Sequence, residues 1–356
     1  MRVATLILLR RECIVCMANI DDVAKLANVS TATVSRVFNN SPYVSEKARE
    51  SVLKAAKELG YEPSILARSL AMKKTNTIGL IVPDISNPYY SEVVRGIEDV
   101  CNIYKYNIIL CNADNSRDKE IQYIDMLKSR WVDGIIFHSD YFSDEIYHIF
   151  KDRKIPLVLA GRATSYDIPY VVIDNRKAAY DATKYLISQG HKKIGVIHGD
   201  LNGMKETVDS VDRLYGFLDA MKEAGLKVYD ELIKESNFKA KGGYMAAKEM
   251  LMGNVKPDAI FAFSDIMAMG AINAIFDAGL KCPEDVSVIG FDNLDLAEVT
   301  RPALATVAQP MYDIGAVAAR MLIKIIDNKK ISEKKVILKH RLIIRQSCIK
   351  RDAQKI

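Results

Sequence analysis

A short segment near the N-terminus carries side chains of the kind that bind DNA bases. Residues 30–38 read Ser-Thr-Ala-Thr-Val-Ser-Arg-Val-Phe, and their apolar positions fall on one helical face. Thr31, Ala32, Ser35 and Arg36 remain on the opposite face, where they offer hydroxyls, a methyl group and a guanidinium. Base edges in the major groove present hydrogen-bonding groups and a thymine methyl that match these side chains. The alternative is an ordinary solvated helix face, and the surrounding sequence has to decide between the two.

A second set of polar and aromatic residues follows apolar runs later in the chain. They are Pro-Asp-Ile-Ser-Asn-Pro-Tyr-Tyr at 83–90, Ser264 with Asp265, and Asp292 with Asn293. In α/β folds, ligands bind beyond the carboxyl ends of parallel strands. Carboxylates bind hydroxyl groups, and aromatic rings pack on the apolar face of a sugar. Asp and Asn also form ordinary turns, so their joint occurrence is the signal for a site that takes a sugar or another small polar metabolite.

Signals of catalysis or metal binding are weak. The chain contains no Gly-x-Gly-x-x-Gly after a predicted strand, no Walker-type Gly-Lys-Ser/Thr and no nucleophile elbow. Cys13 and Cys16 form a lone C-x-x-C without a second pair or a His at zinc-ligand spacing. We therefore expect reduced cysteines and neither metal nor cofactor. An α/β enzyme and a non-catalytic sugar-binding module are the alternatives to a DNA-binding protein.

Three short helices are expected to position the first set of residues. Asn19 and Ser30 offer N-caps for helices over 20–27 and 31–38, and a third helix is expected over 45–59. Two short helices joined by a tight turn and backed by a third form a helix-turn-helix. This arrangement places the start of its second helix in the major groove.

The segment 63–75 is expected to form a hinge helix and linker. Pro63 favours a break before one or two helical turns. So short a helix is marginal by itself, so we expect it to form when it pairs with its dimer mate in the minor groove. There Leu70 would act as an apolar wedge between base pairs while Arg68 or Lys73 meets phosphates. A plain interdomain linker is the alternative.

From residue 77 onward, short β-rich runs alternate with helical stretches. The predicted strands are 78–82, 107–111, 134–138, 157–160, 194–198, 259–263 and 286–291, and the predicted helices are 90–103, 119–129, 177–189, 214–224, 244–251 and 265–278. Strands that are apolar along their whole length indicate parallel sheets covered on both faces. This pattern is too long for one small α/β unit, so we expect two similar lobes with a cleft between them and crossovers near 161–165 and 291–308.

The charge of the chain is unevenly distributed. Residues 1–74 carry twelve Lys and Arg against seven Asp and Glu, which accounts for all of the net charge of +5. A basic head on a neutral body is typical of nucleic-acid binding. Residues 1–17 are expected to be a disordered tail or a start extended beyond the true initiator, since the apolar stretch 4–9 is too short for a secretion signal. No apolar run has the length of a membrane helix, which predicts a cytoplasmic protein.

Several motifs together resemble those of the lactose-repressor (LacI/GalR) family. They are Asp22-Val23-Ala24, Ala27-Asn28-Val29-Ser30, Thr33-Val34-Ser35-Arg36-Val37 and Ala67-Arg68-Ser69-Leu70-Ala71, and the likeness covers residues 18–350. The resemblance implies a repressor of carbohydrate genes that binds double-stranded operator DNA as a homodimer. It implies DNA contacts by Ser30, Thr31, Ala32, Thr33, Ser35, Arg36 and Asn39 in the head, and by Ala67, Arg68 and Leu70 in the hinge helix.

The core of that family is a sensor domain similar to periplasmic sugar-binding proteins. By position, the residues implied to contact a sugar or sugar-phosphate effector are Tyr89, Tyr90, Arg162, Arg213, Phe238, Asp265, Asp292 and Gln309. Arg213 lies in an Asp-Arg-Leu-Tyr-Gly segment that is similar to the family's Arg-Leu-x-Gly. Phe238 stands where the family often has a stacking aromatic ring.

Two stretches, 97–110 and 301–318, are closer to the catabolite-control branch of the family. Members of that branch respond to a serine-phosphorylated phosphocarrier protein, HPr, and Arg301 stands where an arginine would pair with its phosphate. Gly161-Arg162 and the segment 203–210 depart from that branch and are more similar to regulators that bind sugars directly. The sequence leaves open which of these signals controls the protein.

The expected architecture is α/β. It has an all-α helix-turn-helix head over 18–62, a hinge helix and linker over 63–75, and a two-lobed, periplasmic-binding-protein-like core with parallel sheets over 76–350. The first lobe is expected to hold 76–161 and 292–308, and the second 162–291 and 309–345. No leucine-heptad tail follows Arg345, so a dimer is a simpler expectation than a tetramer.

Overall fold

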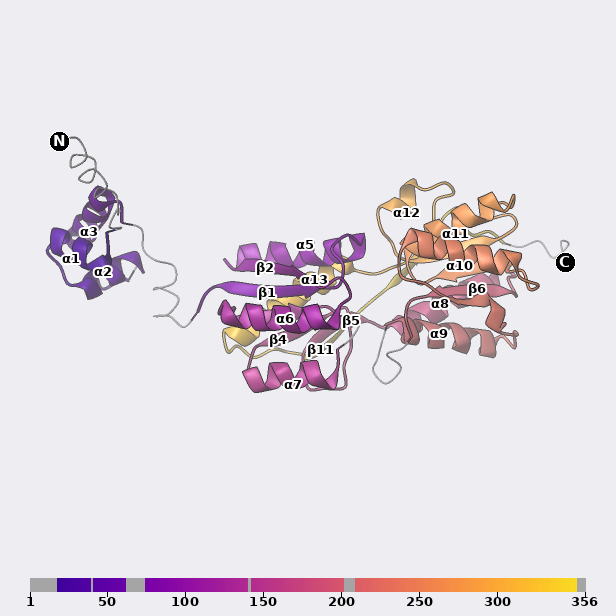
Figure 1. The fold of residues 1–356 in the computed structure, drawn as a ribbon, viewed down its shortest axis with the longest axis horizontal. Coiled ribbons are helices and arrows are strands. Elements are labelled where there is room, and N and C mark those ends of the chain that lie inside the picture. The colour runs from indigo at the N-terminus through magenta and orange to yellow at the C-terminus, as the bar shows by residue number, and fades with distance from the viewer. Residues whose placement is uncertain (1–17, 40, 62–73, 140–141, 202–208, 351–356) are drawn as a thin grey trace, which may run out of the picture. The chain divides into compact units, whose positions relative to one another are not determined.

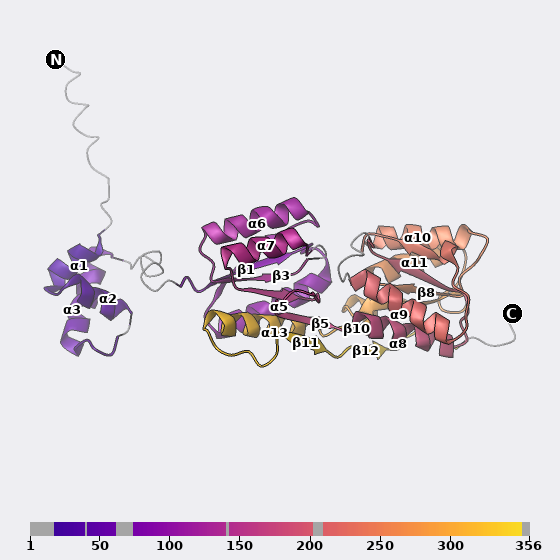
Figure 2. The ribbon, with the colours of Figure 1, turned by 90° about the horizontal axis from the view of Figure 1, so that it is seen from below.

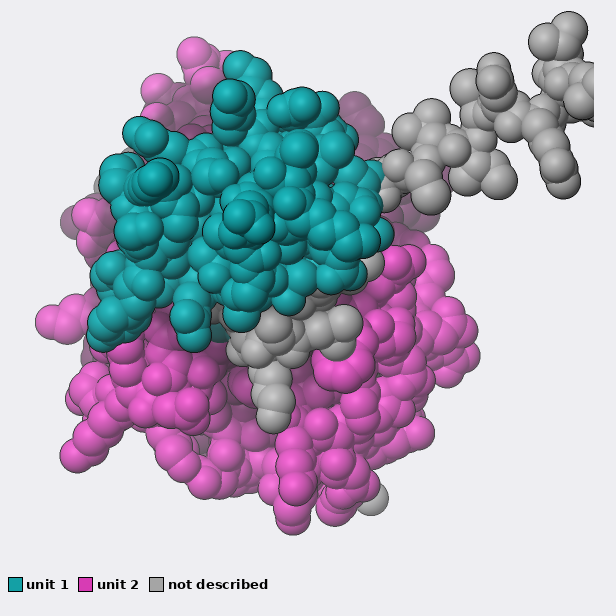
Figure 3. Space-filling model, turned by 90° about the vertical axis from the view of Figure 1, so that its left-hand side faces the viewer, with its two compact units in different colours: residues 1–75 teal, residues 76–356 magenta. Residues whose placement is uncertain are grey.

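The chain divides into two compact units, residues 1–75 and 76–356 (Figure 3). A computed structural model describes residues 18–39, 41–61, 74–139, 142–201 and 209–350. The boundary between the units agrees with the predicted start of the core at residue 76. No helix among the described residues is long and apolar enough to cross a membrane.

The described part of the first unit is a bundle of α1 (Ile20–Ala27), α2 (Thr31–Phe38) and α3 (Glu46–Leu59). Asn19 caps α1 in a capping box with Asp22, and Ser30 caps α2 through the backbone N–H of Thr33. Gly60, with φ of 60°, ends α3 in the left-handed conformation that glycine adopts without strain. These local signals are why the three predicted helices are confirmed.

The first lobe of the second unit is built on a parallel sheet. Its strands, in spatial order, are β11 (Lys335–Leu338), β5 (Tyr170–Ile173), β4 (Leu157–Ala160), β3 (Gly134–Phe137), β1 (Thr77–Val82) and β2 (Asn107–Asn112). The helices α5 (Pro88–Ile103) and α13 (Met311–Ile326) cover one face, and α6 (Arg117–Ser129) and α7 (Asp144–Arg153) cover the other (Figure 2). Alternate residues of β1 therefore enter two separate cores: Ile78 and Leu80 face α5, while Ile81 faces α6.

The second lobe repeats this plan. Its sheet has the order β12 (Arg341–Ile343), β10 (Ala305–Ala308), β9 (Ser287–Asp292), β8 (Ala259–Ala262), β6 (Ile194–His198) and β7 (Ile233–Glu235), with β12 alone antiparallel to its neighbour within the described sheet. The helices α8 (Asn175–Ser188) and α9 (Asp209–Glu223) lie on one side, and α10 (Ala240–Met252) and α11 (Asp265–Asp277) on the other (Figure 1). Two short helical segments, η1 (Asp230–Leu232) and α12 (Leu296–Val299), lie in its connections.

The structure corrects the expected division between the lobes. The segment 292–308 was expected in the first lobe, but β10 pairs with β9 in the second sheet. Conversely, the segment 309–345 was expected in the second lobe, yet α13 packs on α5 and β11 pairs with β5 in the first. The chain crosses after β5, after β10 and between β11 and β12. The first of these crossings follows Ile173 rather than residue 165, because β5 still extends the first sheet.

Candidate DNA-binding surface and effector cleft

The face of α2 that the sequence assigned to DNA is exposed. Val34 and Val37 are buried in the small core of the head. Thr31, Ala32 and Arg36 are exposed on the other side of the helix. The apolar stripe that fixes α2 in the head thus leaves its first turn and its arginine available to a groove of DNA.

The other predicted DNA contacts in the head already make hydrogen bonds within it. The Ser30 hydroxyl accepts the backbone N–H of Thr33 at 3.1 Å and lies 2.9 Å from the Thr33 hydroxyl. The Asn39 amide donates to the Ser35 hydroxyl at 3.4 Å. These hydrogen bonds stabilise the two ends of α2, so the residues that make them have a structural role beside the predicted contact with DNA. The predicted hinge contacts lie outside the described residues: Ala67, Arg68 and Leu70.

Sequence reasoning gave no role to Tyr43, which follows α2 and is 88% exposed. Its loop is held by Arg49, whose guanidinium donates to the backbone carbonyl of Ser41 at 3.1 Å. Tyr43 follows the recognition helix in the sequence, and an exposed tyrosine hydroxyl can donate a hydrogen bond to a DNA phosphate. This role of Tyr43 could not be predicted because Ser-Pro-Tyr between two helices is also typical of an ordinary turn.

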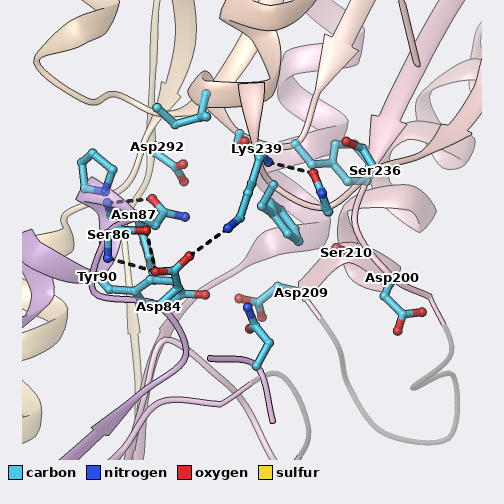
Figure 4. A pocket seen from close by; sticks show the side chains of 18 of the residues that line it. Asp84, Ser86, Asn87, Tyr90, Asp200, Asp209, Ser210, Ser236, Lys239 and Asp292 are labelled. Atoms are coloured by element: carbon cyan, nitrogen blue, oxygen red, sulfur yellow. Dashed lines mark hydrogen bonds and ion pairs between the residues drawn. The ribbon is translucent and has the colours of Figure 1, made fainter. Parts of the chain in front are cut away.

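The second unit contains a cavity of about 410 Å³ between its two lobes, where loops after strands of both sheets meet (Figure 4). We call it the effector cleft. Its lining is Asp84, Ser86, Asn87, Pro88, Tyr89, Tyr90, Asn115, His138, Asp200, Asp209, Ser210, Arg213, Glu235, Ser236, Asn237, Phe238, Lys239, Ala240, Phe263, Ser264, Ile266, Asp292 and Gln309. A cavity of this size with polar groups at strand ends suits a small hydroxylated ligand.

The structure brings six of the eight predicted effector residues to this lining: Tyr89, Tyr90, Arg213, Phe238, Asp292 and Gln309. It places Arg162 and Asp265 behind the walls instead. The guanidinium of Arg162 is buried and donates to the backbone carbonyl of Ser139 at 3.2 Å. The carboxylate of Asp265 is fully buried and accepts from the backbone N–H of Leu294 at 2.8 Å and from the Thr306 hydroxyl at 2.5 Å. Both residues hold protein segments in place rather than facing the cavity.

Arg213 is the buried cation of the cleft. Its Nε donates to the side-chain oxygen of Asn175 at 2.8 Å, and Nη1 donates to the backbone carbonyl of Phe263 at 2.6 Å. Its guanidinium carbon lies 3.7 Å from the centre of the Phe291 ring. Asp209, one turn earlier on α9, lies 4.0 Å from Nη2. These contacts fix the guanidinium plane at the floor of the cleft.

Asp292 ends β9 in an unusual conformation. Its φ of 123° is one that residues other than glycine rarely adopt, and such backbone strain gathers at functional sites. Its carboxylate accepts from the Gln309 amide at 2.8 Å. Burial raises its pKa to about 7, although Arg213 and the Gln309 hydrogen bond act in the opposite direction. Asp292 thus joins β9, an inner strand of the second sheet, to the crossover that begins at Gln309.

A helix-turn-helix and a strand-end cleft in one chain point to a regulator with a sensor domain, and the family models agree. Residues 19–64 match the model of bacterial regulatory proteins of the lacI family. Residues 75–346 match that of periplasmic binding proteins and the sugar binding domain of the LacI family. This chain belongs to the LacI family. Members of this family are transcriptional regulators and not enzymes.

Relatives of this LacI-family protein align with it over nearly its whole length. Catabolite control protein A of Priestia megaterium is 44% identical over 92% of this chain and 98% of its own length. The HTH-type transcriptional regulator RegA of Clostridium saccharobutylicum is 45% identical over 93% and 99%. Among solved structures, the transcriptional regulator CelR–cellobiose complex is similar with a TM-score of 0.71 and 30% identity, over 93% of this chain and all of that one.

The LacI-family cleft contains an aromatic corner that sequence reasoning described only in part. The His138 ring meets Tyr89 and Tyr90 edge to face, with ring centres 5.6 and 4.9 Å apart. His138 is 3% exposed, and burial, followed by the nearby charge of Arg162, lowers its pKa to about 3. A lone histidine after a strand belongs to no motif, so this wall of the cleft could not be predicted from the sequence.

An ion pair joins the two lobes at the mouth of the cleft. Lys239 Nζ, before α10, lies 3.8 Å from a carboxylate oxygen of Asp84, after β1 (Figure 4). Asp84 also accepts hydrogen bonds from the backbone and hydroxyl of Ser86. Because the partners belong to different lobes, the pair lies on the path by which the cleft opens. Two residues distant in sequence gave no local signal for it.

The cleft carboxylates give a prediction on pH dependence. Burial and the neighbouring Asp292 raise the pKa of Asp265 well above its usual range, in the same direction as the pKa of Asp292. Folding therefore retains protons that the unfolded chain releases, and stability is lost as pH rises from about 4 through about 7. We expect the free energy of unfolding to fall by about 2 kcal/mol between pH 5 and pH 8 through Asp292. Asp292→Asn is expected to remove that part of the slope in urea unfolding.

Asp219 provides the control for this experiment. It is exposed and its pKa is lowered by its hydrogen bond to Arg176, so it titrates below this pH window. Asp219→Asn is expected to keep the wild-type slope between pH 5 and pH 8. A slope in Asp292→Asn equal to that of the wild type would contradict the assignment.

Proposed function

We propose that this chain is a cytoplasmic, homodimeric repressor of carbohydrate genes that senses a small sugar in its effector cleft. The observation that carries the proposal is the combination in one chain of an exposed recognition helix and a polar cavity between two lobes. A ligand that favours one degree of lobe closure would shift the spacing of the two heads in the dimer and with it the affinity for DNA.

Exposed apolar side chains on the first lobe support the dimer. Ile103 and Tyr104, at the end of α5, are 72% and 48% exposed, and Leu110 on the edge strand β2 is 42% exposed. Large apolar residues clustered near a sheet edge are typical of protein interfaces. A second copy would cover these side chains and place two recognition helices on the two halves of a pseudopalindromic operator.

The test is a fluorescence-anisotropy titration of the full chain on DNA from its own upstream region, at fixed salt, with and without a panel of sugars. We expect specific binding that at least one sugar changes. If no fragment is bound more tightly than a scrambled fragment of equal length, the proposal of a repressor fails.

Serine-phosphorylated HPr is a second candidate signal, and Arg301 favours it. Arg301 is exposed next to α12, where Leu296 and Val299 are 45% and 67% exposed. Its Nη1 donates to the backbone carbonyls of Val299 and Thr300, which fixes the direction of the guanidinium. An oriented arginine beside apolar side chains suits a phosphoserine on a protein surface. If phosphorylated HPr tightens operator binding and Arg301→Ala abolishes that effect, HPr is the partner; if neither occurs, it is not.

A further inference from the structure

We propose that the effector cleft takes a free, uncharged sugar and rejects the phosphate ester of the same sugar. This inference rests on the proposed sugar-sensing function and specifies its ligand. It is drawn from the charges that face the cavity, from the partners of those charges, and from a buried polar group without a partner.

Acidic side chains outnumber basic ones around the cavity. The acidic residues in the described lining are Asp84, Asp200, Asp209, Glu235 and Asp292, against the cations Arg213 and Lys239. Because the pKa of Asp292 is raised to about 7, it is only partly ionised at neutral pH, and the other four acids still outnumber the two cations. Figure 4 shows several of these acidic groups around the cleft, with Asp209 and Asp292 from the second lobe and Asp84 from the first. A phosphate ester would add close to two negative charges to this excess. The field inside a cleft of low dielectric makes that repulsion stronger than it would be in water.

Both cations already have protein partners. Arg213 donates to Asn175 and to the carbonyl of Phe263, and its remaining nitrogen lies 4.0 Å from Asp209. Lys239 at the mouth is paired with Asp84. A phosphate would have to share these cations with their present protein partners. A hydroxyl group, in contrast, hydrogen-bonds to the carboxylates and leaves the pairs intact.

Of the three helix N-termini that face the cleft, those of α5 and α11 are capped by side chains. A helix N-terminus is otherwise a natural anion site. The Asn87 side chain accepts the N–H of Tyr89 at the start of α5, and Ser264 accepts that of Met267 at the start of α11. At the start of α10, the Asn237 side chain accepts only the N–H of the N-cap residue Lys239, and no side chain caps the first turn. The caps of α5 and α11 reduce the number of backbone donors left for a phosphate.

His138 supplies the independent sign of a ligand. It lines the cavity at 3% exposure, and its Nδ1 has no hydrogen-bond partner among the described residues. A buried polar atom without a partner is costly. Nδ1 itself has almost no accessible surface, so a ligand hydroxyl satisfies it once the ring turns this nitrogen toward the cavity. The lowered pKa keeps this imidazole uncharged at neutral pH, so it adds a hydrogen-bonding group for a hydroxyl but no attraction for a phosphate.

The experiment compares matched ligands by isothermal titration calorimetry on the full chain. The pairs are ribose with ribose 5-phosphate, glucose with glucose 6-phosphate and fructose with fructose 6-phosphate, and cellobiose and glucosamine are added as free sugars. We expect at least one free sugar to bind, and its phosphate ester to bind about 30-fold more weakly or worse. A phosphate ester that binds as tightly as its free sugar overturns the inference, and so does a panel in which no free sugar binds.

Charge variants test whether the cleft carboxylates cause the preference for a free sugar over its phosphate ester. In the double variant Asp209→Asn, Glu235→Gln, the ratio between free sugar and ester is expected to shrink several-fold. Glu249→Gln removes one negative charge from an ion pair with Lys234 on the outer side of α10 and should leave the ratio unchanged. Equal effects of both changes would show that the cleft carboxylates do not select the ligand.

His138→Leu separates a ligand contact from simple packing. We expect it to weaken binding of the free sugar while the thermal unfolding midpoint stays the same or rises, since an unsatisfied buried nitrogen is removed. Unchanged sugar affinity would remove His138 from the site. Operator binding is measured on the same samples: if it persists while a phosphate ester is the tighter ligand, only the ligand class is wrong, whereas loss of all specific DNA binding refutes the proposed function.

Discussion

Replacing Arg213 by Met is expected to abolish the response to the effector and to lower the free energy of unfolding by about 3 kcal/mol. The guanidinium is 5% exposed and joins α9 to Asn175 at the start of α8 and to the carbonyl at the end of β8. Met keeps the aliphatic part of the side chain but removes the guanidinium that lies over the Phe291 ring, and it leaves those acceptors without a donor. The loss stays near the low end for a broken buried pair because Asp292 is able to take up a proton.

Arg176→Met is the matched control. Arg176 is an exposed arginine on α8 that pairs with Asp219 at 2.7 Å and lies over the Tyr215 ring. Exposed ion pairs contribute little to stability, so urea unfolding and the sugar response are expected to stay close to wild type. If the two variants lose stability equally, the role of Arg213 as an organiser of the cleft is wrong.

The structure also shows which features the sequence determines locally. The head could be predicted to within a residue because the side chains of Asn19 and Ser30 begin helices and the backbone freedom of Gly60 ends one. The same holds for strands such as β4 and β6, whose apolar runs are long enough to be buried on both faces. In these elements the signal and the structure it specifies lie within one short window.

The division of the lobes could not be predicted because it depends on pairing across the chain. The strands β11 and β12 are only half-buried, so their apolar pattern is weak, whereas β5 and β10 are as short and as buried as β4. Which sheet each joins is decided by partners 11 or more residues away, and in the pairing of β11 with β5 the partners lie far apart in the chain. The sequence indicated two lobes and a cleft, but the positions of the crossovers follow from contacts that no local pattern records.

The effector cleft shows the same limit. The rule that ligands bind beyond strand ends located Tyr89 and Asp292, which line the cavity. It does not show which way a side chain turns, so Asp265, at the end of a strand as expected, faces Leu294 and Thr306 instead. His138 and Lys239 were missed because a single histidine or lysine in a loop has no pattern of its own.

Replacing Arg36 by Ala is expected to weaken binding to the operator about 10- to 100-fold. Arg36 is exposed on α2, on the face opposite the buried Val34 and Val37, so its removal leaves the core of the head intact. A guanidinium that reads a guanine contributes about 1–3 kcal/mol to discrimination between bases. Anisotropy titrations on the operator and on a scrambled fragment at fixed salt measure both the affinity and the ratio between the two.

The ratio between the affinities for operator and scrambled DNA distinguishes the two ways in which an arginine binds DNA. A contact to a base edge lowers affinity for the operator more than for scrambled DNA, whereas a contact to phosphate lowers both and reduces the salt dependence by about one ion. Lys57→Ala removes the same charge from the exposed side of α3 and controls for the loss of long-range attraction. Because Lys57 lies on a different helix, we expect it to weaken both complexes slightly and equally. If Arg36→Ala behaves like Lys57→Ala, Arg36 does not read a base, and base recognition is assigned to Thr31 and Ala32 at the start of the same helix.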